Sequence, residues 1–111
     1  MTITCLIRYE IDPFQKEAFV DYAGNWGQAI PANGADLIGY FAPHEGSATT
    51  AYGIYNIESL SAYEAYRARL IADPLAKENY AMAKAKQFIR REDRIFLKLA
   101  SGPHGKLIQH P

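Results

Sequence analysis

The stretch Ile3-Thr4-Cys5-Leu6-Ile7-Arg8-Tyr9 decides the fold, because its apolar residues alternate as they do in a strand. Successive side chains of a strand point to opposite faces of a sheet. One face therefore carries Ile3, Cys5, Ile7 and Tyr9, while Leu6 lies on the other. A second stretch, 37–42, is apolar on both faces. A sheet that is covered on one side only should alternate apolar and polar residues, so this sheet needs a cover on each side.

The remaining sequence predicts two more strands and three helices. Strands are expected at 3–9, 37–42, about 49–57 and about 94–100. Helices are expected from Asp12-Pro13 to about Ala29, from Ser59 or Ser61 to about Ile71, and from about Leu75 to Phe88. Pro31 and Gly34 are expected to stop the first helix. The order β-α-β-β-α-(α)-β predicts an α+β ferredoxin-like split βαβ sandwich, with a four-stranded antiparallel sheet and its helices on one face.

Helices on one face leave the other face of the sheet bare. We expect a second copy of the chain to cover it, which predicts a homodimer. A closed barrel of two sheets is one way to bury such a face.

Composition narrows the class of protein. The chain has 111 residues and a formal net charge of zero, which suits one domain, expected at 1–100, followed by a tail or arm at 101–111. Without a basic excess we expect no nucleic-acid or membrane partner. Arg90-Arg91 and Arg94 are interpreted as part of a solvated turn. The single cysteine, Cys5, is expected to be a buried, inert thiol, and the absence of a leader predicts a cytoplasmic protein.

Several motifs together resemble the NIPSNAP family. They are Arg8-Tyr9-Glu10-Ile11-Asp12-Pro13, Gly34-Ala35-Asp36-Leu37-Ile38-Gly39-Tyr40-Phe41, Pro43-His44-Glu45-Gly46, Ser59-Leu60-Ser61-Ala62-Tyr63-Glu64-Ala65-Tyr66-Arg67, and Leu70 with Asp73-Pro74. The resemblance implies a dimeric α/β barrel of ferredoxin-like subunits and no agreed catalytic mechanism. One departure is Ile7, at a position where members of the family often have arginine, so no role of that arginine carries over.

Arg67 is the first candidate for a binding residue. At helical spacing it falls among Leu60, Tyr63, Leu70 and Ile71, which are expected to form the inward stripe of the second helix. An inward guanidinium needs a carboxylate, a carbonyl group or a bound anion. An internal ion pair or a stem that reaches solvent would satisfy it. The alternative is that Arg67 grips the carboxylate of a small ligand.

His44 and a set of aromatic residues are further candidates. His44 lies in a Pro-His-Glu-Gly loop, where it could act as a general base or as a metal or haem ligand. The aromatic residues are interpreted as core that also borders a helix–sheet cleft. The candidate ligand-binding residues are Arg67, His44, Tyr9, Trp26, Tyr40 and Tyr63.

The functional interpretation is correspondingly broad. Nucleotide-binding, zinc-hydrolase and serine-hydrolase signatures are absent from the sequence, and no cofactor or metal is expected. We expect a small homodimeric protein that binds an apolar or carboxylate-bearing ligand in a helix–sheet cleft. The alternatives are a cofactor-independent monooxygenase or haem-binding enzyme of the same superfold, and a structural adaptor or interaction module.

Overall fold

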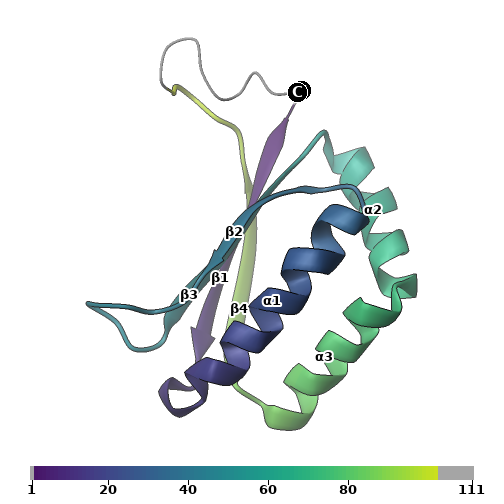
Figure 1. Ribbon diagram of the computed structural model, residues 1–111. Helices are drawn as coiled ribbons and strands as arrows, with labels where there is room; N and C mark the ends of the chain where they lie inside the picture. The colour runs from purple at the N-terminus through teal and green to yellow at the C-terminus, as the bar shows by residue number, and fades with distance from the viewer. Residues whose placement is uncertain (1, 103–111) are drawn as a thin grey trace.

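The computed structural model describes residues 2–102 and confirms the ferredoxin-like fold (Figure 1). Its elements are β1 (Ile3–Ile11), η1 (Pro13–Gln15), α1 (Lys16–Ala32), β2 (Asp36–Phe41), β3 (Thr50–Ile57), α2 (Leu60–Ala72), α3 (Pro74–Lys86) and β4 (Ile89–Leu97). The strands form one antiparallel sheet in the order β2-β3-β1-β4. Figure 1 shows α1, α2 and α3 packed on the same face of this sheet.

The core lies between the sheet and the helices, as the alternation in β1 predicts. Cys5, Ile7, Tyr9 and Ile11 are buried toward the helices. The predicted face of α1 meets them, and its buried residues are Phe19, Tyr22, Trp26, Ala29 and Ile30. Burying such side chains removes apolar surface from water, which is the main favourable contribution to folding.

The ends of α1 differ from the sequence prediction. Asp12 does cap the start, since its Oδ1 accepts a hydrogen bond from the Phe14 backbone N–H at 2.9 Å, but the first turn is a 3₁₀ turn. The helix also passes through Pro31 to Ala32, so the prediction that Pro31 stops it was wrong. A proline near the end of a helix removes one hydrogen bond without preventing the last turn. Gly34, at a φ of +102°, then turns the chain toward β2, as predicted.

β4 begins at Ile89, five residues before the predicted strand. The prediction missed this first half of the strand because it is charged. The interpretation of Arg90 to Arg94 as a turn was therefore wrong: these residues belong to β4, and those from Arg91 to Arg94 are paired with β1. β4 is an edge strand, and an edge strand tolerates charged side chains because solvent reaches it. α3 correspondingly ends at Lys86 and not at Phe88, and Gln87 adopts a left-handed conformation at a φ of 52°.

The buried stripe of α2 also differs from the prediction. Leu60 and Ile71 are 58% and 61% exposed, so they are not inward residues. The buried residues of α2 are Tyr66 and Leu70. Arg67, adjacent to Tyr66, is half-buried, which places it at the edge of the inward face.

The face of the sheet away from the helices is apolar at its centre. Leu6 lies between Ile54 on β3 and Ile95 on β4, and all three side chains are half-buried or exposed. Polar side chains such as Arg8 and Asp93 flank this row. No partner chain is present, so the expected second cover remains a prediction.

Some expectations lie outside what the fold can test. Within residues 2–102, no helix is both long enough and apolar enough to cross a bilayer. The cytoplasmic location and the division into 1–100 and a tail remain predictions. Most of that tail, 103–111, lies outside the described residues.

Candidate functional site

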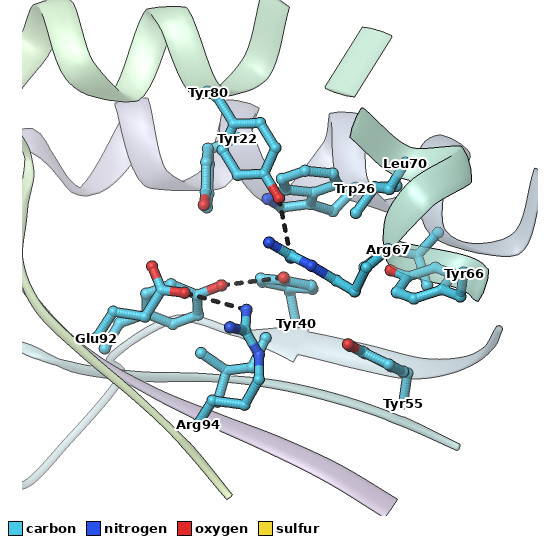
Figure 2. Close-up of a pocket in the computed structure, with 13 residues that line it drawn as sticks. Tyr22, Trp26, Tyr40, Tyr55, Tyr66, Arg67, Leu70, Tyr80, Glu92 and Arg94 are labelled. Atoms are coloured by element: carbon cyan, nitrogen blue, oxygen red, sulfur yellow. Dashed lines mark hydrogen bonds and ion pairs between the residues drawn. The ribbon is translucent and has the colours of Figure 1, made fainter. Parts of the chain in front are cut away.

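A pocket between the helices and the sheet gathers side chains from seven of the elements described above (Figure 2). α1, α2 and α3 supply Tyr22, Trp26, Ile30, Tyr66, Arg67, Leu70 and Tyr80, and the four strands supply Ile7, Tyr9, Tyr40, Tyr55, Glu92 and Arg94. In Figure 2 the Arg67 side chain lies between Trp26 and Tyr80 on the helix side and Tyr40 and Arg94 on the sheet side. The wall of the pocket is therefore mainly aromatic, and charged groups project into the pocket.

Local geometry places the aromatic residues. Tyr22 and Trp26 are four residues apart on α1, so they share a face, and their ring centroids are 5.7 Å apart. Trp26 also packs edge-on against Tyr80 of α3 at 5.1 Å. These three rings form the part of the wall that α1 and α3 supply together.

A bulge in β2 places Tyr40 on the helix side of the sheet. The pairing of β2 with β3 shifts between Leu37 and Gly39, so Leu37 and Tyr40 face the same way although they are three residues apart. The Tyr40 ring then lies over Gly53, where an added Cβ would come within 2.6 Å of it. The Tyr40 and Tyr9 hydroxyls are hydrogen-bonded at 3.0 Å. Glycine at position 53 is thus what lets Tyr40 reach the pocket.

The charged groups of the described lining are Arg67, Arg94 and Glu92. Glu92 and Arg94 are two residues apart on β4 and therefore face the same side, with the Arg94 Nη2 atom 3.2 Å from Glu92 Oε2. The Arg67 Nη1 atom donates to the Tyr80 hydroxyl at 3.3 Å. Among the interactions found within 2–102, Arg67 has no ion pair, so the internal ion pair, one of the two explanations that need no ligand, is not present there.

Two buried donors of the pocket lack a hydrogen bond of good geometry. In the part of the chain that the structure describes, Trp26 Nε1 and Arg94 Nε have no hydrogen-bond partner. Trp26 is 3% exposed, so its indole N–H is also removed from bulk water. A buried donor without a partner costs free energy, which a bound acceptor would recover.

Burial keeps the phenols of the pocket in their neutral form. It raises the pKa of Tyr22 to about 12 and raises the pKa values of Tyr9 and Tyr40 above their usual range. Burial also raises the pKa of the Cys5 thiol, which agrees with the predicted inert cysteine. At neutral pH the tyrosines therefore act as neutral hydrogen-bonding groups.

The cavity is small as it stands. Its volume is about 20 Å³, which is room for about one water molecule, and it is partly open to solvent. A larger ligand needs side chains at the mouth to move. Arg67 and Tyr80 are suited to this, because a single 3.3 Å hydrogen bond between long, solvent-accessible side chains is easily broken.

The structure brings together four of the six predicted site residues. Arg67, Tyr9, Trp26 and Tyr40 all line the pocket. Tyr63 lies next to it, with its ring 6.1 Å from Tyr66 and 4.8 Å from Phe96, but is not part of the lining.

His44 lies elsewhere. It is exposed in the loop between β2 and β3 and borders a shallow hollow with Arg8 and Tyr52, on the other face of the sheet. The structure therefore separates His44 from Arg67. Within residues 2–102 there is also no cluster of three His, Cys, Asp or Glu side chains that could hold a metal ion.

Sequence reasoning missed Glu92, Arg94, Tyr66 and Tyr80 as pocket residues. Glu92 and Arg94 gave no signal, because the charged half of β4 has no apolar alternation and was interpreted as a turn. The signal for Tyr66 was its position between Tyr63 and Leu70 on α2. Tyr80 gave no signal, because the alanine-rich helix around it has little apolar periodicity.

Comparisons with known proteins agree with this architecture. A NIPSNAP protein with unknown function from Agrobacterium tumefaciens is similar at a TM-score of 0.78 and 20% identity, with 93% of this chain and 92% of that chain covered. An uncharacterised NIPSNAP-like domain protein from Burkholderia xenovorans gives 0.74 and 23%, with 92% and 89% covered. A Nitrosomonas europaea protein, whose provisional name is antibiotic biosynthesis monooxygenase, gives 0.68 and 11%, with 91% and 100% covered.

At these identities the structural likeness shows the fold alone. A search of curated proteins finds no match. The family model of NIPSNAP, in contrast, matches residues 4–102, which is nearly the whole chain. This chain therefore belongs to the NIPSNAP family.

Proposed function

We propose that this protein binds a small carboxylate-bearing molecule with an apolar body in the pocket between its helices and its sheet. The observation that carries this proposal is that two guanidinium groups, Arg67 and Arg94, line one aromatic pocket. The described lining holds one carboxylate, Glu92, to balance them. A formal positive charge is thus left over beside an apolar wall.

The chemistry of the lining suits such a ligand. Arginine presents several donors in a planar fork that matches a carboxylate. The rings of Trp26, Tyr22 and Tyr80 offer an apolar surface for a planar body. The unused Trp26 N–H adds one donor for a neutral acceptor on the ligand. A pocket with an apolar wall and a few convergent polar groups is the usual form of a small-molecule site.

We also propose that the protein acts as a homodimer through the open face of its sheet. The supporting observation is the apolar row Leu6, Ile54 and Ile95 on that face, together with exposed Leu97 and Phe41 nearby. A second copy would remove these side chains from water. Obligate dimers typically bury apolar faces against each other.

A second candidate function is the oxidation of a phenolic substrate without a cofactor. It is favoured by Glu92, a carboxylate within the pocket that could accept the proton of a bound phenol. The fold shared with the Nitrosomonas europaea protein supports it only as an analogy. Oxygen uptake with a panel of quinols and polyphenols tests this candidate, and Glu92→Gln should abolish any uptake that is found.

Native mass spectrometry tests the binding proposal and the dimer together. We expect the purified protein to appear as a dimer that carries a small-molecule adduct or takes up added benzoate. Arg67→Met should lose the adduct, whereas Lys84→Met, which removes an exposed charge on α3, should keep it. A wild-type protein that neither carries an adduct nor takes up benzoate would contradict the binding proposal.

A further inference from the structure

The pocket already contains a carboxylate of its own, held close to one of its two arginines. Glu92 and Arg94 both project from the helix-facing side of β4, where Tyr9 and Ile7 are their partners on β1. Their charged atoms are 3.2 Å apart, and the side chains are 35% and 27% exposed. Glu92 therefore places a negative charge beside Arg94 in this pocket.

The formal charges of the described lining add to plus one. Arg67 and Arg94 contribute two positive charges and Glu92 one negative charge, while burial keeps the phenols neutral. One ligand carboxylate would neutralise this pocket. A second negative charge on the ligand would lie near Glu92 and would find no further cation among these residues.

The Trp26 indole N–H indicates which group the rest of the ligand should carry. Trp26 Nε1 is buried and has no partner within residues 2–102. As an indole N–H it can only donate, so it suits a carbonyl, hydroxyl or amide oxygen. A neutral acceptor satisfies it without adding charge to the pocket.

We propose, on the basis of the function proposed above, that the pocket selects planar monoanionic acids that carry a second, neutral acceptor, and that Glu92 determines this selectivity by repelling dianions. Glu92 acts through its charge and its hold on Arg94 and needs no covalent step. Removing the charge of Glu92 should weaken the preference for monoanions, because it should improve binding of a dianion more than binding of a monoanion.

Isothermal titration calorimetry at pH 7 with two ligands of the same shape tests this proposal. The ligands are 3-carbamoylbenzoate, a monoanion, and isophthalate, a dianion that differs in one charged group. Two like charges about 4 Å apart near a protein surface repel strongly enough to change an affinity by at least about tenfold. We therefore expect wild-type protein to bind 3-carbamoylbenzoate at least about tenfold more tightly than isophthalate.

Variants then identify Glu92 as the cause. Glu92→Gln should reduce the ratio of the two dissociation constants to about twofold or less. Glu92→Asp, which keeps the charge, should retain most of the ratio. Glu64→Gln removes a carboxylate from the exposed side of α2 and should leave the ratio unchanged. Thermal unfolding of each variant shows whether the fold is kept.

Each outcome has a separate meaning. A wild-type protein that binds both ligands equally, or a ratio that survives Glu92→Gln, would overturn the role of Glu92 while leaving the proposed binding function standing. Failure of wild-type protein to bind either ligand would overturn the binding function and this inference with it. Should Glu92→Gln not fold, Glu92→Ser, which also removes the charge, takes its place in the same titration.

Discussion

Arg67 on α2 and Tyr80 on α3 are joined across the mouth of the pocket by a hydrogen bond of 3.3 Å from the guanidinium Nη1 to the phenol oxygen. The Tyr80 ring also packs on Trp26, so one tyrosine connects an arginine at the mouth with a tryptophan in the wall. Both residues line the pocket, whose cavity of about 20 Å³ is partly open to solvent. Ligand entry should therefore depend on how firmly Tyr80 holds Arg67.

Tyr80→Phe tests this closure. The variant keeps the ring against Trp26 and removes only the acceptor for Arg67, so we expect faster association of benzoate and an equilibrium affinity within about threefold of wild type. The free energy of unfolding should change by less than about 1 kcal/mol, because an exposed hydrogen bond contributes little. Stopped-flow fluorescence measures the association rate. A tenfold loss of affinity would instead show that the Tyr80 hydroxyl binds the ligand itself.

The core can be tested with two phenylalanines that lie five residues apart. Phe19 is fully buried, whereas Phe14 is 94% exposed in the 3₁₀ turn. Phe19→Ala should cost about 3–5 kcal/mol of unfolding free energy, because it leaves a cavity against Tyr9 and Phe88. Phe14→Ala should change stability by no more than about 0.5 kcal/mol. Urea unfolding of both variants checks the difference, and similar losses would contradict this description of the core.

Alkaline pH should destabilise the fold through its buried phenols. Burial raises the pKa of Tyr22 to about 12, above the value of about 10 in an unfolded chain. Between these values the folded state binds more protons than the unfolded state, so stability is present below pH 10 and falls as the pH rises toward 12. The expected contribution of Tyr22 is about 1.4 kcal/mol per pH unit in this range. In urea unfolding from pH 9 to pH 12, the free energy of unfolding should fall less steeply with pH for Tyr22→Phe than for wild type. An equally steep fall in the two proteins would contradict this prediction.

The open face of the sheet should control the oligomeric state. Ile95 is 48% exposed there, so Ile95→Glu leaves the core intact and places a charge in the proposed dimer interface. We expect this variant to sediment as a monomer at micromolar concentration while wild type remains a dimer. Ile71→Glu is the matched control, because Ile71 is 61% exposed on α2 in the other layer. A wild-type monomer, or a dimer that survives Ile95→Glu, would contradict the interface.

The sequence predicted the fold because its strongest patterns are local. Alternation in 3–9 identifies the central strand, and the helical spacing of Phe19, Tyr22 and Trp26 identifies the buried side of α1. The charged half of β4 was missed because a solvent-accessible edge strand carries no apolar alternation there. A local sequence pattern is therefore informative where burial determines which side chains of an element are apolar.

The candidate site was predicted less completely, for a related reason. Arg67 was identified because a charge on an inward helix face is unusual, and Trp26 because it belongs to a clear apolar stripe. Glu92, Arg94 and Tyr80 enter the pocket only when β4 and α3 are packed against α1, and no local pattern encodes that packing. His44 stood beside a glutamate in the sequence, but the fold places it on the opposite face of the sheet.

The central claim is that Arg67 and Arg94 bind a carboxylate beside Trp26. Trp26 is the single tryptophan of the chain, so its intrinsic fluorescence reports on this pocket alone. The decisive measurement is a titration of wild type, Arg67→Met and Arg94→Met with benzoate, with benzyl alcohol as the uncharged comparison. We predict a saturable change in wild-type fluorescence with benzoate and affinities at least about tenfold weaker in both variants. The claim would be contradicted if benzoate did not change the fluorescence of wild type. It would also be contradicted if both variants bound benzoate as tightly as wild type does.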